Sequence, residues 1–309
     1  MAEGQMGNTV KCPQIRDGAK ERAAIVLRHS FNRLIGGIQS QKANRREYNA
    51  HNLVLANHWD GSVQQFYHFL LGYFMPLSLW LDKNDETRIA VRDCGPMNTW
   101  FQAMTSSPDI EIVPPGSALH AVIGDRTKHT ILRGMDDPNK FDQSRLLAGA
   151  QSVKRRLSVL NQARRTETRT LIVDRASSED FYHGPESETH MSGRERRHVP
   201  NILEIAKLPA FQLQADVVDF ARMAPQEQIE KSMNADALVG QHGAGLVHML
   251  WMPQGSNIIE IAPPLPPQVQ EIFAKLAHTL GHRYSRIPQD GVHAPVDLIE
   301  VSQALDQAS

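Results

Sequence analysis

A glycine-rich turn between two apolar runs is the stretch of this sequence best suited to chemistry. The run Ala237–Val239 leads into Gly240-Gln-His-Gly-Ala-Gly245, and the apolar run Leu246–Trp251 follows. The order strand, glycine turn, helix aims free backbone N–H groups and the positive end of a helix dipole at one point, where a phosphate can bind. The alternative is a tight structural turn, because the motif matches neither the G-x-G-x-x-G pattern nor the Walker pattern.

Composition and charge exclude several classes of protein. The 309 residues suffice for two domains of ordinary size or one large domain. Lys+Arg (33) and Asp+Glu (34) nearly balance, so nothing indicates bulk binding of nucleic acid. Cys12 and Cys94 make neither a disulfide framework nor a zinc site, and Met1–Lys11 lacks the apolar core of a signal peptide. A cytoplasmic setting is favoured, with a lumenal domain trimmed of an N-terminal anchor as the alternative.

The elements before the turn follow the order of a parallel α/β sheet. Strand-like runs occupy His51–Ala56, Arg88–Arg92, Ile110–Val113 and Leu119–Ile123, and helical patterns occupy Ala19–Ile38, Val63–Leu81, Asn98–Met104 and Ser144–Leu160. The uncharged stretch Val63–Leu81 contains polar groups and Pro76. We therefore expect a buried helix, ended or kinked at Pro76, rather than a membrane span. The alternation predicts a parallel-sheet α/β domain.

A second set of strands and helices surrounds the glycine turn. Further strands are expected at Arg169–Asp174, within Phe211–Phe220, at Asn257–Ile261 and at Arg283–Ile287. Helices are expected from Val199 and from Pro225, along an apolar stripe from Val269 to Leu280 that stops at Gly281, and over Val296–Leu305. The long polar stretch Ala176–Arg194 is either a mobile lid over a site or a variable surface insertion.

The two sets of elements predict two β/α domains with a cleft between them. Arg164–Thr168 is the candidate boundary. We expect a flexible tail over residues 1–18, a first α/β domain over residues 19–165 and a second, Rossmann-like domain over residues 166–309. Ligands of such sheets bind at the carboxyl ends of the strands, which places the site in the cleft.

The whole string around the glycine turn is more specific than the turn alone. His242-Gly-Ala-Gly-Leu246, Pro253-Gln-Gly-Ser256 and Glu260 follow one another in the order found in glycosyltransferase family 61, which this sequence resembles. Weaker similarities occur in the same order upstream, at Gln64–Leu71, at the strand Thr170–Arg175, at Arg194–Arg197 followed by Asn201, and at Met223–Ile229. The resemblance covers roughly residues 50–285.

The resemblance implies a fold and an activity. The fold would be of the GT-B type, two Rossmann-like domains that face a cleft. The activity would be transfer of a sugar, with inversion, from a nucleotide-sugar donor, usually a UDP-sugar, to a glycan or polysaccharide acceptor. The donor would bind mainly to residues 166–309 and the acceptor to the first domain. No metal or other cofactor is expected to be required, because protein dipoles and cations can stabilise the leaving diphosphate.

The resemblance also assigns candidate donor-binding residues. Preorganised N–H donors and arginines aimed at the leaving diphosphate lower the barrier to its departure. The backbone donors would be those of Gly243, Ala244 and Gly245. Arg175 and Arg197 would supply guanidinium groups, although each could equally be an ordinary ion-pairing arginine. His242 would contact ribose or phosphate, or else bond the backbone of its turn, and Glu260 would bind a ribose hydroxyl or cap its strand.

An inverting transfer also needs a base to accept the proton of the acceptor hydroxyl. His68 is the first candidate and Asp60 the second. Family members commonly carry an acidic residue three or four positions after this histidine, where the chain has Leu71 and Gly72. The loss motivates an alternative function, a catalytically inactive nucleotide-sugar-binding or scaffold protein. A dehydrogenase on a doubly wound sheet is a further alternative, which the absence of G-x-G-x-x-G disfavours.

Overall fold

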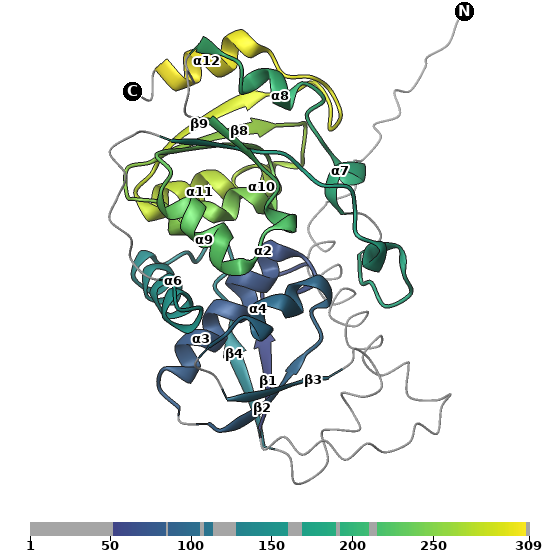
Figure 1. Cartoon of the computed structure of the whole chain (residues 1–309), viewed down its shortest axis with the longest axis vertical. Coiled ribbons are helices and arrows are strands. Elements are labelled where there is room, and N and C mark those ends of the chain that lie inside the picture. Colours follow the sequence, from purple (N-terminus) through teal and green to yellow (C-terminus); the bar gives the residue numbers. More distant parts are fainter. Residues whose placement is uncertain are drawn as a thin grey trace, which may run out of the picture.

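A computed structural model describes residues 52–84, 86–105, 108–113, 128–159, 169–189, 192–209 and 215–306. Over these ranges the chain forms two parallel β-sheets with helices packed against them (Figure 1). The prediction of an α/β protein with parallel sheets is therefore confirmed. The predicted tail, the helix Ala19–Ile38, the run Leu119–Ile123 and the boundary Arg164–Thr168 lie outside the described residues.

The first sheet has the strand order β3-β2-β1-β4, and all its pairings are parallel. Its strands are β1 (Asn52–Asn57), β2 (Arg88–Arg92), β3 (Asp109–Val113) and β4 (Lys128–Arg133). The central strands β1 and β2 are built on apolar runs that are fully buried, as at Leu53 and Ile89. Strand β4 was not predicted, because this edge strand mixes polar residues with an exposed Ile131 and lacks an apolar run.

The predicted helix Val63–Leu81 forms, but as three consecutive segments. These are α2 (Phe66–Phe69), the π-helical η2 (Leu70–Phe74) and α3 (Met75–Leu81). Pro76 does not end the helix, because the chain stays helical through it to Leu81; the α-helical pattern is interrupted just before it, at the π-helical turn. The Met75 N–H donates to the Leu70 carbonyl, one residue further back than in an α-helix, and the Leu71 carbonyl accepts from the Met135 N–H at 2.9 Å. The helix is buried as expected, and no helix among the described residues is long and apolar enough to cross a membrane.

The second sheet has the order β6-β5-β7-β8-β9 and is also wholly parallel. Its strands are β5 (Thr170–Val173), β6 (Ala215–Val218), β7 (Ala237–Gln241), β8 (Asn257–Ala262) and β9 (Arg283–Pro288). The chain steps from β5 to β6 in one direction and then returns to β7 on the other side of β5. This reversal of strand order is a topological switch point, outside which the ligands of open parallel sheets bind.

Helices cover both faces of the second sheet (Figure 1). The face toward the first sheet carries α9 (Pro225–Met233), η7 (Ala244–Trp251), α10 (Pro267–Gln270) and α11 (Ile272–Leu280). The opposite face carries α8 (Ile202–Ile205) and α12 (Leu298–Asp306) over a smaller apolar core. The apolar run after the glycine turn is a 3-10 helix, and Gly281, at φ 78°, ends α11 as predicted.

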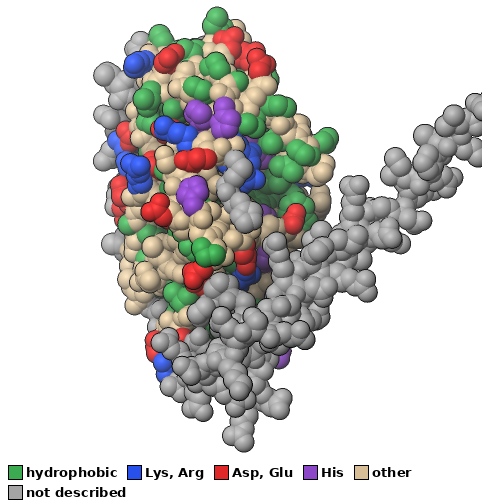
Figure 2. All heavy atoms as spheres, turned by 90° about the vertical axis from the view of Figure 1, so that its right-hand side faces the viewer, with side chains coloured by type: hydrophobic (Ala, Val, Ile, Leu, Met, Phe, Trp, Pro, Cys, Tyr) green, Lys and Arg blue, Asp and Glu red, His purple; other side chains and the backbone are tan. Residues whose placement is uncertain are grey.

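One continuous apolar core joins the two sheets and their helices. It contains residues of the first half, such as Phe69 and Trp100, together with residues of the second half, such as Leu246 and Phe273. Helices α4 (Asn98–Gln102) and α6 (Gln143–Arg156) contribute to the same core. On the face shown in Figure 2, cationic and acidic side chains intermingle, in keeping with a net charge of -1.

Candidate functional site

A cavity lies at the carboxyl ends of β5 and β7 and is lined from both halves of the chain. The second half contributes Val173–Glu179, Gly243–Gly245 and the pair Arg196 and Arg197. The first half contributes apolar side chains that include Phe66 and Trp100. The cavity therefore sits at the switch point of the second sheet, where the parallel-sheet rule places a ligand.

The glycine turn is shaped around an arginine. Gly243 has φ 153° and ψ −175°, a backbone conformation that is essentially restricted to glycine. A Cβ atom at this position would overlap the guanidinium group of Arg175. Arg175 Nη2 donates to the carbonyl oxygen of His242 at 2.8 Å, and Arg197 Nη1 donates to the same oxygen at 3.1 Å. The structure thus brings together the two arginines that the sequence singled out.

The cavity carries an excess of positive charge. Within the described ranges, Arg175, Arg196 and Arg197 form no ion pair with a carboxylate. Burial, reinforced by repulsion from the other two arginines, lowers the pKa of Arg175 to about 9. Burial and the charge of Arg196 lower the pKa of Arg197 to about 10. Both remain cationic near neutral pH, so a bound anion would relieve an unfavourable cluster of charges.

Residues of the glycine turn line the same cavity and offer backbone donors. Ala244 and Gly245 begin η7 and line the cavity wall. The first hydrogen bond of the turn runs from the Leu246 N–H to the Gly243 carbonyl at 2.9 Å, so the two preceding N–H groups lie ahead of it. The first N–H groups of a helix have no partner within the helix. Together with the arginines they form a site for an anion such as a diphosphate.

His242 and Glu260 form a buried pair behind this turn. His242 Nδ1 donates to Glu260 Oε1 at 2.6 Å, and Tyr284 Oη donates to Glu260 Oε2 at 2.7 Å. Burial lowers the pKa of His242, and the hydrogen bond to Glu260 opposes that shift. Neither His242 nor Glu260 lines the cavity; both side chains are buried behind the glycine turn. They hold the His242 carbonyl that both arginines contact.

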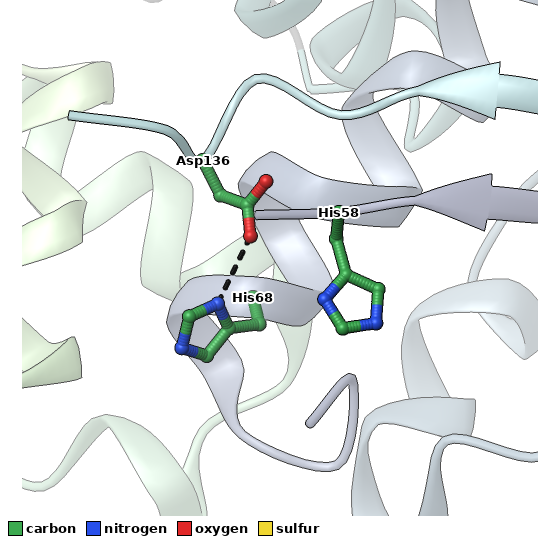
Figure 3. A group of neighbouring side chains, drawn as sticks. All are labelled: His58, His68 and Asp136. Carbon is green, nitrogen blue, oxygen red and sulfur yellow. Dashed lines mark hydrogen bonds and ion pairs between the residues drawn. The ribbon is translucent and has the colours of Figure 1, made fainter. Parts of the chain in front are cut away.

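The two base candidates from the sequence have different surroundings, and Figure 3 shows those of His68. His68 Nδ1 lies 2.9 Å from Asp136 Oδ2, and His58 lies beside this pair, with 6.2 Å between the two imidazole centroids. Asp60 is exposed, and its carboxylate accepts from the N–H of Gly61 at 2.7 Å. His68 therefore has a carboxylate partner, whereas Asp60 belongs to an exposed turn. Neither residue lines the cavity, although Gln65 and Phe66, just before His68, do.

Asp136 is the residue of this group that the sequence reasoning missed. It follows β4, outside every strand, helix and motif expected from the sequence. Strands β1 and β4 pair in parallel, so the segments after them, which contain His58 and Asp136, meet at one edge of the sheet. An aspartate directly after a parallel strand is a signal of a site residue. It could not be used here, because β4 itself was not predicted. The side-chain position at Gly72 lies close by: a Cβ there would be 3.1 Å from Asp136 Oδ2.

The polar stretch Ala176–Arg194, predicted as a lid or an insertion, packs against the first half of the chain and forms one wall of the cavity. It contains η4 (Asp180–His183) and α7 (Gly193–Arg196), and Tyr182 lines the cavity. Gln64 of the first half is fully buried beneath this stretch. Its Nε2 donates to the Glu186 carbonyl at 3.1 Å, and its Oε1 accepts from the Glu188 N–H at 2.6 Å. The Tyr182 hydroxyl donates to the Gln64 carbonyl at 2.8 Å.

We expect Gln64→Ala to release this wall without unfolding the protein. The change removes two side-chain hydrogen bonds, each worth about 1 kcal/mol, so amide exchange over residues 182–189 should accelerate roughly 10- to 100-fold. Hydrogen–deuterium exchange with mass spectrometry measures this, with Gln65→Ala as control, since no hydrogen bond of the Gln65 side chain to the wall is present in the described chain. Equal exchange in the two variants would contradict the fastening role of Gln64.

The arrangement defines a class of protein, and comparison with known proteins gives the family. An arginine-rich cavity beside a glycine turn, at the switch point of a parallel sheet, is typical of α/β proteins that bind phosphate-bearing ligands. The chain belongs to glycosyltransferase family 61, whose sequence model matches residues 66–259.

A segment of the chain is also similar to an EGF domain-specific O-linked N-acetylglucosamine transferase of Drosophila melanogaster. The two proteins are 33% identical over 82 residues, which is 25% of this chain. The aligned segment spans 16% of the length of the Drosophila protein.

Proposed function

We propose that this protein transfers a sugar from a nucleotide-sugar donor to a hydroxyl of a glycan acceptor, with inversion at the anomeric carbon. The observation that carries the proposal is the convergence of unpaired arginines on a glycine turn at the switch point of the second sheet. Membership of glycosyltransferase family 61 supports the same reaction class. In this proposal the two sheets act as the two Rossmann-like halves of a GT-B fold.

The donor diphosphate is placed between Arg175, Arg197 and the N–H groups of Ala244 and Gly245. Departure of the nucleoside diphosphate leaves negative charge on its terminal phosphate, and fixed cations and N–H donors stabilise that charge. Arg196 adds a third cation to the cavity. The arginines supply the charge compensation that a divalent cation supplies in other enzymes, so we propose that transfer needs no metal at the diphosphate.

The acceptor hydroxyl loses its proton to His68. An imidazole is suited to this step because its ordinary pKa lies close to neutral pH. The polar contacts of His68 within the described chain are confined to Nδ1, so Nε2 is left to accept the proton. The alternative that the first half lacks a base altogether is weakened by the carboxylate partner of His68, Asp136.

We expect nucleoside diphosphates to stabilise the protein in the presence of EDTA. Ligands that bind the native state raise its melting temperature by mass action. The panel contains UDP, GDP, UDP-N-acetylglucosamine and NAD, the third because of the Drosophila relative. Arg175→Ala and Arg197→Ala should each weaken binding about 10- to 100-fold, the effect of losing a charge-assisted hydrogen bond of about 1.5–3 kcal/mol.

Arg155→Ala is the matched control, because Arg155 pairs with Asp82 on the surface of α6, away from the cavity. Isothermal titration calorimetry gives the dissociation constants. Failure of every nucleotide to bind the folded protein would refute the proposal. Binding without transfer or donor hydrolysis would favour the scaffold alternative, and preferential binding of NAD would favour a dehydrogenase.

A further inference from the structure

We propose that Asp136 is the positioning residue of the base His68, holding the imidazole in the one tautomer that can accept a proton from the acceptor. The inference rests on the proposed function, because it concerns how His68 would act in that reaction. It goes beyond it by assigning a role to a residue outside every motif of the sequence. Figure 3 shows the carboxylate directed at the His68 ring from the segment that follows β4.

The Asp136 carboxylate is fixed on both oxygens. Its side chain is 1% exposed. Oδ1 accepts from the Trp59 N–H at 2.9 Å, and Oδ2 lies 2.9 Å from His68 Nδ1. The backbone carbonyl of Asp136 accepts from the Tyr67 hydroxyl at 2.8 Å, which anchors the residue to the helix that carries His68. A buried carboxylate with both oxygens engaged cannot rotate away from the imidazole without losing a hydrogen bond.

This contact decides which nitrogen of His68 is basic. An ionised carboxylate only accepts hydrogen bonds, so Nδ1 must carry the hydrogen in the His68–Asp136 contact. The lone pair of the neutral ring is then on Nε2. The contact thus selects the proton-accepting form before substrate arrives, and it stabilises the imidazolium that forms afterwards.

The Nε2 edge of the ring is kept accessible by a glycine. Gly61 has φ 71°, and a Cβ atom at this position would overlap Nε2 of His68. The His68 side chain is 13% exposed, in contrast to its buried partner. Any side chain on residue 61 would therefore collide with the nitrogen that accepts the proton.

A glycine also makes room for the carboxylate. At Gly72, on the helix turn after His68, a Cβ atom would lie 2.8 Å from the Cβ of His58 and 3.1 Å from Asp136 Oδ2. Residues four apart share one helix face, so an acidic side chain at position 72 would point toward the same space. Here that space is taken by a carboxylate from a different part of the chain.

The proton and electron balance of the step is complete. The acceptor O–H bond breaks and its proton bonds to Nε2, while the oxygen's electron pair forms the new bond to the anomeric carbon. The bond from that carbon to the diphosphate oxygen breaks, and its electron pair leaves with the nucleoside diphosphate. Asp136 stays ionised beside the imidazolium, which later returns its proton to solvent.

The same side chains could instead coordinate a metal ion. Ligand atoms of His58, His68 and Asp136 all lie within 4.8 Å of one another. A metal ion bound through His68 Nδ1 would displace the hydrogen from that nitrogen. The hydrogen-bonded pair and the metal site are therefore mutually exclusive states of these atoms, and one spectrum distinguishes them.

The decisive experiment is nitrogen-15 NMR of the histidine rings in the full-length protein, with and without EDTA, for the wild type and Asp136→Asn. The asparagine can donate to Nδ1, which should move the ring hydrogen of His68 to Nε2. We expect a Nδ1–H tautomer in the wild type, unchanged by EDTA, and the reverse tautomer in the variant. A Nε2–H tautomer in the wild type, or a spectrum that changes when EDTA removes a bound metal, would overturn the proposal.

Enzyme kinetics of the same variant provide a second test of the proposal. Asp136→Asn should lower kcat about 10³- to 10⁴-fold, the loss seen when a serine protease triad loses its carboxylate, with unchanged KM and unchanged nucleotide binding. Asp137→Asn is the control, because Asp137 pairs with the exposed Lys140; its kcat should stay within twofold of wild type. A kcat of Asp136→Asn close to wild type would refute the role. If the wild type itself binds no nucleotide, the proposed function fails, whereas the NMR result still reports the tautomer.

Discussion

Gly243→Ala should weaken nucleotide binding more than any other single added methyl group in this protein. The new Cβ would overlap the Arg175 guanidinium, which would have to leave the His242 carbonyl. The backbone at φ 153° is also unfavourable for alanine, at a cost of about 1–3 kcal/mol. Losing both the arginine and the turn geometry should weaken binding by on the order of 100-fold or more.

Gly255→Ala is a matched control for this prediction. Gly255 also has a positive φ, 83°, but a Cβ atom there would meet nothing within 4 Å. The control therefore carries a backbone cost of about 1 kcal/mol without any clash. Thermal melts and calorimetric titration with UDP measure both variants. Equal nucleotide affinity of the two variants would show that the contact between Gly243 and Arg175 is unimportant for the anion site.

The central strands could be predicted from the sequence because the pattern that marks them lies within a few consecutive residues. Strands β2 and β7 are short apolar runs, as required of strands buried on both faces of a parallel sheet. The glycine turn followed from the same local pattern. The pairing order of the strands is not local information, so the switch point between β5 and β7 became visible only in the fold.

The chemistry of the site was predictable only where a motif marked it. Arg175 and Arg197 were identified from the resemblance, but their shared acceptor, the His242 carbonyl, required the fold. His242 and Glu260 are 18 positions apart and meet because β7 and β8 pair in a register that places Gly240 opposite Glu260. Asp136 was missed because it follows an edge strand that has no apolar pattern.

Glu260→Ala should cause the largest loss of stability among single side-chain changes at the site. Glu260 is 0% exposed and joins the buried His242 to the partly buried Tyr284, so its removal leaves two hydrogen-bond donors without an acceptor. Each donor left without its acceptor in this way costs about 1–3 kcal/mol. In a chain of this size the loss corresponds to a decrease in melting temperature of roughly 10 °C.

The same change should weaken nucleotide binding, although Glu260 lies outside the cavity. The His242 ring is anchored by Glu260, and the His242 carbonyl is the acceptor for both arginines of the anion site. Tyr284→Phe is the control, because it removes one hydrogen bond and leaves the pairing of His242 with Glu260 intact. We expect it to lose less than half as much stability and to retain nucleotide affinity. A Glu260→Ala protein with wild-type affinity for UDP would show that the position of the carbonyl is set by the arginines themselves, and that the buried pair serves stability alone.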